Sequence, residues 1–251
     1  MIWRWLIFSK TIARFLLAAP LLVCCAGPLG LCAATVSGRV SVASSQDPNV
    51  RKHQDYSGVV VWLEPLDGAA TIPASVHRAV MLQKDKTFTP HVLAITVGTT
   101  VDFPNDDPIF HNAFSNYNGQ IFDIGLYPPG TTRSIGFRRE GVVRVFCNIH
   151  PTMSAVIVVL RSPYFSVSNK AGNVEIPDIP AGSYRVHVFH ERATEQTLGA
   201  LERVVEVSGT QIQLPPLSVS ESGYLPVPHK NKYGKDYPPP VDSGTYPGSK
   251  P

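Results

Sequence analysis

Short strand-like segments separated by turn residues run through the chain from residue 36 to residue 214. In these segments apolar and β-branched residues alternate with polar ones or follow one another for a few positions, and glycine, proline and asparagine mark the breaks. No stretch repeats apolar residues at helical spacing over enough turns to predict a long helix. The pattern therefore predicts an all-β fold.

The first part of the chain, residues 35–161, is expected to form one β-sandwich domain, because the number and spacing of its strands suit that architecture. The expected strands cover residues 36–42, 58–64, 79–82, 92–97, 100–103, 132–137, 142–147 and 155–160.

A second, smaller β-sandwich is expected over residues 162–219, where strands alternate with a glycine turn and a Pro-Ala-Gly turn. The pattern G-x-V-x-I-x-x-I-P-x-G-x-Y between Gly172 and Tyr184 resembles the regulatory-like domains of carboxypeptidases. This resemblance implies an Ig-like or transthyretin-like fold. It says little about function, since such modules serve many proteins as spacers or docking surfaces.

Residues 220–251 form a tail rich in proline, tyrosine, lysine, glycine and serine. Few aliphatic side chains are available there to offset the entropy of ordering, so the tail is expected to be disordered. The alternative is an extended proline-rich arm that lies on the protein or binds a partner.

The first 34 residues have the layout of a secretory leader, with three basic residues, an apolar stretch and small residues up to Ala34. We expect cleavage after Ala34 and export to the periplasm or beyond. A membrane anchor is the alternative, but prolines and glycines interrupt the apolar run before it reaches about 18 residues. The mature chain is therefore expected to have no integral membrane span.

Loss of the leader removes three basic and no acidic residues from totals of 22 Lys+Arg and 19 Asp+Glu, which leaves 19 of each. A neutral mature chain gives no reason to expect nucleic acid or an anionic membrane as a partner.

The leader also carries three of the four cysteines, so Cys147 alone remains after cleavage. A single thiol in an oxidising compartment is open to intermolecular pairing or oxidation unless it is protected or used. Binding a metal would achieve both, and an inert buried cysteine is the alternative.

Two further potential metal donors follow this cysteine closely in the sequence. Cys147, His150 and Met153 form the pattern C-x2-H-x2-M. Thiolate, imidazole and a weak thioether are the donors of a type 1 (blue) copper site, which needs one further imidazole. His111, at the far end of a turn, can supply it. A zinc site is the alternative, but one cysteine and one nearby histidine lack the paired spacing of zinc ribbons.

Upstream, the pattern V-x-F-x-N-x5-H-N runs from Val101 to Asn112. Together with C-x2-H-x2-M it resembles the cupredoxins, and the short ligand loop is like that of amicyanin. Residues 81–160 as a whole are similar to bacterial proteins of the methylamine utilisation or plastocyanin-like type. The resemblance implies a cupredoxin-type Greek-key β-sandwich and copper cycling between Cu(I) and Cu(II).

The resemblance also implies roles for individual residues. His111, Cys147 and His150 would bind copper in one plane, and Met153 would be the long axial ligand. Asn112 would tie the histidine strand to the ligand loop. His150 would be the solvent-reaching electron port, so redox donor and acceptor proteins would dock near it. The implied function is one-electron transfer without conversion of a substrate.

Two other functions are alternatives to electron transfer. Multicopper oxidases and nitrite reductases place a histidine beside the copper cysteine, whereas Phe146 and Asn148 flank Cys147 here. An enzyme is therefore not expected. The second alternative is a copper-delivery or surface-interaction protein in which the Ig-like domain and the tail do the main work.

Overall fold

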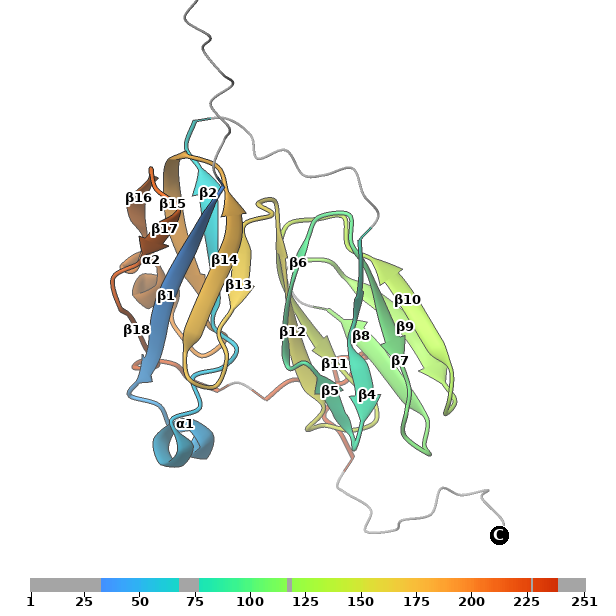
Figure 1. Ribbon diagram of the computed structural model, residues 1–251. Helices are drawn as coiled ribbons and strands as arrows, with labels where there is room; N and C mark the ends of the chain where they lie inside the picture. Colours follow the sequence, from blue (N-terminus) through green and yellow to red (C-terminus); the bar gives the residue numbers. More distant parts are fainter. Residues whose placement is uncertain (1–32, 68–76, 117–118, 227, 239–251) are drawn as a thin grey trace, which may run out of the picture. The chain divides into compact units, whose positions relative to one another are not determined.

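The computed structural model describes residues 33–67, 77–116, 119–226 and 228–238 (Figure 1). Residues 1–32 of the expected leader and residues 239–251 of the tail lie outside the described residues. Ala34, the last residue of the expected leader, is the first residue of strand β1.

Nearly all of the regular elements among the described residues are strands, which confirms the predicted all-β fold. The strands are β1 (Ala34–Ala43), β2 (Val60–Pro65), β3 (Arg78–Val80), β4 (Leu82–Lys84), β5 (Thr87–Thr89), β6 (Val92–Thr96), β7 (Thr100–Pro104), β8 (His111–Ser115), β9 (Phe122–Tyr127), β10 (Thr132–Gly136), β11 (Gly141–Phe146), β12 (Ser154–Leu160), β13 (Phe165–Val167), β14 (Asn173–Ile179), β15 (Gly182–Phe189), β16 (Arg203–Val207), β17 (Gln211–Gln213) and β18 (Leu217–Ser220). Two short helices, α1 (Pro48–His53) and α2 (Glu195–Gly199), complete the described elements.

Strands β3 to β12 build a β-sandwich, here called the central sandwich. One sheet has the order β10-β7-β3, the other has the order β6-β12-β11-β8-β9, and β4 and β5 form a hairpin. Side chains from both larger sheets meet in one apolar core that includes Phe103, Phe122, Val145 and Ile157. Alternation along β11 and β12 sends every second residue into this core, which is the two-residue period of a strand.

The remaining strands build a second β-sandwich, here called the flanking sandwich. One of its sheets has the order β14-β1-β17 with β18 also paired to β1, and the other has the order β13-β2-β15-β16. Its core is a separate cluster of aliphatic side chains from both sheets, including Val36, Leu63, Ile176 and Val186.

The strand pairing differs from the predicted division of the chain at residue 161. The sequence pattern places the strands expected at 36–42 and 58–64 in the first domain, but β1 pairs with β14, and β2 pairs with β13 and β15. Figure 1 shows these blue and cyan strands among the orange strands of the flanking sandwich. The second sandwich therefore combines strands from both sides of the central one.

Three strands of the central sandwich were not expected from the sequence, namely β5, β8 and β9. All five residues of β8 are buried, including His111 and Asn112, so polar residues interrupt the apolar alternation that would reveal this strand. The strand expected at 79–82 is instead two short strands, β3 and β4.

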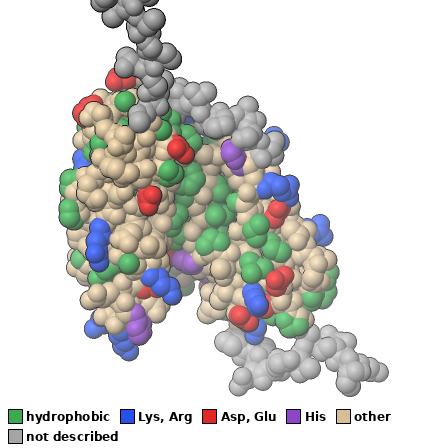
Figure 2. All heavy atoms as spheres, in the orientation of Figure 1, with side chains coloured by type: hydrophobic (Ala, Val, Ile, Leu, Met, Phe, Trp, Pro, Cys, Tyr) green, Lys and Arg blue, Asp and Glu red, His purple; other side chains and the backbone are tan. Residues whose placement is uncertain are grey.

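Acidic and basic side chains are interspersed on the face that Figure 2 shows. Among the described residues, no helix has the length and apolar character needed to cross a bilayer.

Candidate metal centre

The loop between β11 and β12 carries three of the predicted ligands. The last pair of this antiparallel ladder is Phe146 with Ser154, so residues 147–153 form the hairpin connection, here called the ligand loop. The Cys147 amide donates to the Met153 carbonyl at 3.1 Å, and the Met153 amide donates to the His150 carbonyl at 3.1 Å. These bonds fold the loop back on itself and set the spacing of its donors.

The fourth predicted ligand comes from β8, which pairs with β11 through Phe114 and Phe146. Continuation of this antiparallel register places Asn112 opposite Asn148 and brings His111 to the ligand loop. The Asn148 amide donates to Asn112 Oδ1 at 3.2 Å, which fixes the two segments to each other. Asn112 thus joins β8 to the ligand loop.

His111, Cys147 and His150 converge, with one donor atom from each lying within 4.8 Å of the others. The Cys147 Sγ atom lies 3.8 Å from His111 Nδ1 and 3.6 Å from His150 Nδ1. The two imidazole rings meet edge to face with centroids 4.9 Å apart. Within the described part of the chain, this is the group of His, Cys, Asp and Glu residues whose geometry suits a metal ion.

Met153 is fully buried in the same apolar cluster as Cys147. Its burial places the thioether in a dry, apolar environment. A site with two imidazoles, a thiolate and a weak thioether is the donor set of blue copper centres, so the residues present fit a copper ion.

His111 is oriented by Asp107, a residue that sequence analysis did not identify. Asp107 Oδ2 lies 2.6 Å from His111 Nε2, and both side chains are buried, at 7% and 0% exposure. A carboxylate can only accept this hydrogen bond, so Nε2 carries the proton and Nδ1 offers its lone pair toward Cys147. A histidine whose far nitrogen donates to a carboxylate is a common arrangement at metal sites.

Asp107 is itself fixed by the backbone. Its carboxylate accepts from the amide of Asp85 at 2.7 Å and from the amide of Lys86 at 2.9 Å. Burial raises the pKa of Asp107, but the Lys86 amide, the His111 ring and the Asp85 amide together bring the pKa below its ordinary value. The group is therefore an anion at neutral pH.

Asn105 braces the turn that holds Asp107. Its Nδ2 donates to the Ile109 carbonyl at 2.9 Å, and its Oδ1 accepts from the Asp107 amide at 3.1 Å. The turn between β7 and β8 is thus a rigid support for the carboxylate that orients His111.

His150 differs from the other donors because it is only half-buried. Burial, and then the electrostatic influence of the neighbouring His111 ring, lower the pKa of His150 to about 4. The ring is therefore neutral at physiological pH and can offer Nδ1 to a metal. Phe110, which precedes His111, is 42% exposed, and Pro151, which follows His150, is also exposed.

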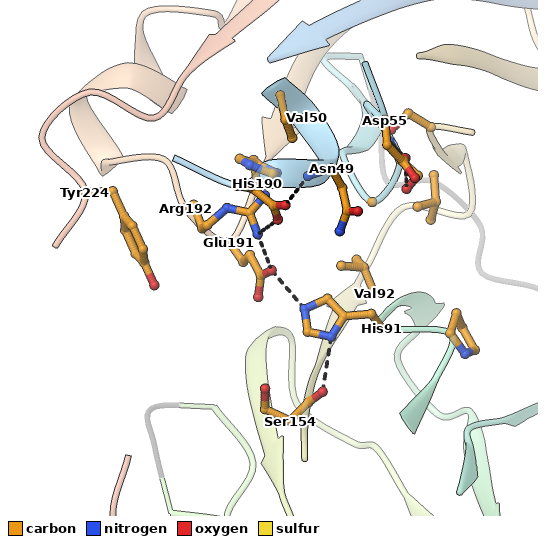
Figure 3. Close-up of a pocket in the computed structure, with 16 residues that line it drawn as sticks. Asn49, Val50, Asp55, His91, Val92, Ser154, His190, Glu191, Arg192 and Tyr224 are labelled. Carbon is orange, nitrogen blue, oxygen red and sulfur yellow. Dashed lines mark hydrogen bonds and ion pairs between the residues drawn. The ribbon is translucent and has the colours of Figure 1, made fainter. Parts of the chain in front are cut away.

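A polar cavity of about 610 Å³ lies apart from these donors (Figure 3). His91 points into it and bonds to Glu191 at 2.8 Å and to the Ser154 carbonyl at 3.1 Å. Arg192 pairs with Asp47 at 3.2 Å. Arg192 also pairs with Glu191 at 3.4 Å, so these charged groups of the cavity lining have ionic partners.

The tail differs from the sequence expectation. Residues 228–238 were expected to be disordered, yet they hydrogen-bond to the ligand loop through His229, Lys232 and Tyr237. Polar side chains rather than buried aliphatic area hold this segment, so the alternative of an arm lying on the protein describes it better.

Comparison of the sequence with family models gives no match. The chain is 38% identical over 60 residues to the methylamine utilization protein MauL of Methylorubrum extorquens. That match covers 24% of this chain and 53% of the relative, so the chain spans about half the length of the curated protein it resembles.

Several solved structures are also similar to part of the chain. A purple cupredoxin from Nitrosopumilus maritimus is 28% identical with a TM-score of 0.30, covering 34% of this chain and 99% of that one. A mutant of amicyanin is 21% identical with a TM-score of 0.31, covering 37% and 100%. A copper-containing nitrite reductase from Thermus scotoductus is 23% identical with a TM-score of 0.32, covering 48% and 28%.

Proposed function

We propose that this chain is a cupredoxin-like type 1 copper protein that carries single electrons between redox partners. The observation that carries this proposal is the convergence of His111, Cys147 and His150 in a largely buried site. Met153 is buried in the same apolar cluster as Cys147, which supports its place in the donor set. The similarity to a purple cupredoxin, to amicyanin and to MauL agrees with it.

His111, Cys147 and His150 would hold copper, and Met153 would complete the donor set. Bound copper would supply a one-electron couple. The chain supplies a rigid arrangement of donors. The β8–β11 register and the folded ligand loop fix these donors, so they need little movement when the charge of the site changes. Small rearrangement favours rapid transfer in either direction.

Water is kept from most of the site. His111, Cys147 and Met153 are buried, so the half-buried His150 is the donor through which an electron would enter and leave. A redox partner would dock over His150 and the exposed Phe110 through a small interface of about 1,200 Å² or less. Rapid exchange calls for such a weak complex.

Residues 1–34 would act as a cleaved leader, which places the protein in the periplasm or outside the cell. Cleavage would leave Cys147 as the remaining cysteine, and this residue is buried, which agrees with an oxidising compartment. Sequencing the amino terminus of the protein recovered from the periplasmic fraction tests this part; an intact Met1 would contradict it.

The decisive experiment is a visible and electron paramagnetic resonance spectrum of the Cu(II)-loaded protein, with Cys147→Ser as the control. We expect an intense thiolate-to-copper charge-transfer band in the wild type and its loss in the variant. A colourless wild-type protein would contradict the proposal. One-way loss of copper to an acceptor protein, without reversible reduction, would favour copper delivery over electron transfer.

A further inference from the structure

The tail folds into a short turn beside the ligand loop. Asn231 organises this turn, because its Oδ1 accepts from the amides of Tyr233 and Lys235 at 3.0 and 3.1 Å. Its backbone closes the turn with bonds to Lys235 and Gly234 at 2.9 Å. We call residues 229–237 the strap.

Two strap side chains bind backbone carbonyls of the ligand loop. The Tyr237 hydroxyl donates to the Cys147 carbonyl at 2.8 Å, and His229 Nε2 lies 2.8 Å from the Pro151 carbonyl. The His229 ring also stacks on Phe146, with centroids 4.0 Å apart and an interplanar angle of 24°. The same segment therefore holds the ligand loop at two positions, Cys147 and Pro151.

Lys232 closes a ring of hydrogen bonds with the two ligand-bearing segments. Its Nζ contacts Asp123 Oδ2 at 2.7 Å, and its amide donates to Asn148 Oδ1 at 2.9 Å.

The other half of this ring joins Asp123 to the loop. Asp123 Oδ1 accepts from Asn112 Nδ2 at 2.7 Å, and Asn112 Oδ1 accepts from the Asn148 amide at 3.2 Å. Asn112 follows His111 and Asn148 follows Cys147, so the ring links the residues adjacent to two of the metal donors.

We propose that the strap is a clamp that holds the ligand loop against β8, with Lys232 and Tyr237 as positioning residues for Cys147 and His111. This inference rests on the proposed copper site for its purpose, but the clamp is a property of the chain without metal. Metal leaves such a site when the ligand loop opens away from β8. The strap opposes this opening because its bonds to Cys147, Asn148 and Pro151 must break first.

Each strap bond is expected to slow opening of the ligand loop about 3- to 10-fold, the usual contribution of one intramolecular hydrogen bond. Loss of the Lys232 side chain also leaves Asp123 without its cation, and the remaining members of the ring are then free to rearrange. The geometry of the copper–thiolate bond should change with them, because Asn112 and Asn148 sit next to the donors.

Two pairs of full-length variants test the clamp. Tyr237→Phe removes the hydroxyl that binds Cys147, and Tyr224→Phe removes the hydroxyl of a tyrosine outside the strap as its control. Lys232→Met removes the cation of the ring, and Lys230→Met removes an exposed lysine two residues earlier. The rates to measure are amide hydrogen exchange of residues 147–153 in the metal-free protein and copper release to a chelator.

In Tyr237→Phe and Lys232→Met we expect loop exchange and copper release about 3- to 10-fold faster than in wild type, with a shifted charge-transfer band. Lys232→Arg keeps the positive charge and should therefore show rates close to those of wild type. Both control variants should behave as wild type. Unchanged loop exchange in both test variants would refute the clamp, whatever the metal does. A wild type that binds no copper would instead refute the proposed function, and loop exchange would still decide the clamp.

Discussion

Replacement of Asp107 by asparagine gives the sharpest test of how the site selects one form of His111. The carboxylate accepts three hydrogen bonds, from the Asp85 amide, the Lys86 amide and His111 Nε2. An asparagine at this position has one acceptor oxygen and one donor nitrogen. Either orientation of the amide therefore sets two donors against each other.

If the amide nitrogen takes the place of Oδ2, it faces both Lys86 N–H and His111 Nε2. His111 can relieve this clash only by moving its proton to Nδ1, the atom that faces Cys147 at 3.8 Å. A proton there competes directly with a metal. In the opposite orientation the amide nitrogen faces the Asp85 N–H and leaves a buried donor unsatisfied, which costs about 1–3 kcal/mol of folding stability.

We therefore expect Asp107→Asn to weaken copper binding by about 10- to 100-fold. This factor corresponds to about 1.4–2.7 kcal/mol of binding free energy. A competition titration with a chelator of known affinity measures it, and Asp106→Asn, which alters an exposed neighbour, is the matched control. An affinity within about threefold of wild type, with Nδ1 of His111 still unprotonated by NMR, would refute the reasoning.

Three further outcomes are expected. The pKa of His150 falls from 6.5 to about 4 on folding. Between these pH values the His150 ring is protonated in the unfolded chain and neutral in the folded chain. Urea unfolding of the metal-free protein should show stability falling from about pH 6.5 to about pH 4, with a flatter profile in His150→Phe. Met153→Leu nearly conserves volume and should cost under about 1.5 kcal/mol of stability. It should nevertheless raise the reduction potential in voltammetry, because Cu(II) loses an electron-donating thioether. Ile157→Ala, at a fully buried core position, should lower the free energy of unfolding by about 2–5 kcal/mol. Denaturant titration measures this loss, and the dependence of the free energy on denaturant concentration should stay as in wild type.

The donors of the site could be predicted because they are concentrated in the sequence. Cys147, His150 and Met153 lie within seven residues, and a hairpin connection keeps such neighbours close whatever the rest of the fold does. His111 could be proposed from its turn and from the resemblance, and the β8–β11 register shows how it reaches the loop. Their binding of copper stays a prediction until metal is added.

Asp107 escaped the sequence analysis because its role depends on distant backbone. The available signal was an acidic residue four positions before His111 in a turn containing Asn105. That signal alone describes many solvated turns. The amides of Asp85 and Lys86, which make this carboxylate a buried anion, approach it only in the folded chain.

The membership of β1 and β2 could not be read from local pattern either. Alternation shows that a segment is a strand and which face is buried, but it does not name the partner strand. β1 finds its partners more than a hundred residues away, in β14, β17 and β18. The tail was misjudged for a related reason, since its hydrogen bonds need acceptors that the ligand loop presents only after folding.

The placement of β2 beside β13 has a consequence for how the chain can fold as it is made. The central sandwich is continuous in sequence between these two strands, so a chain emerging amino terminus first has everything it needs for that unit by about residue 160. β1 and β2 are synthesised earlier but must wait, unpaired, for β13 to β18. The donors would thus be assembled before the flanking sandwich closes, and the strap, made last, would fasten a loop that already exists.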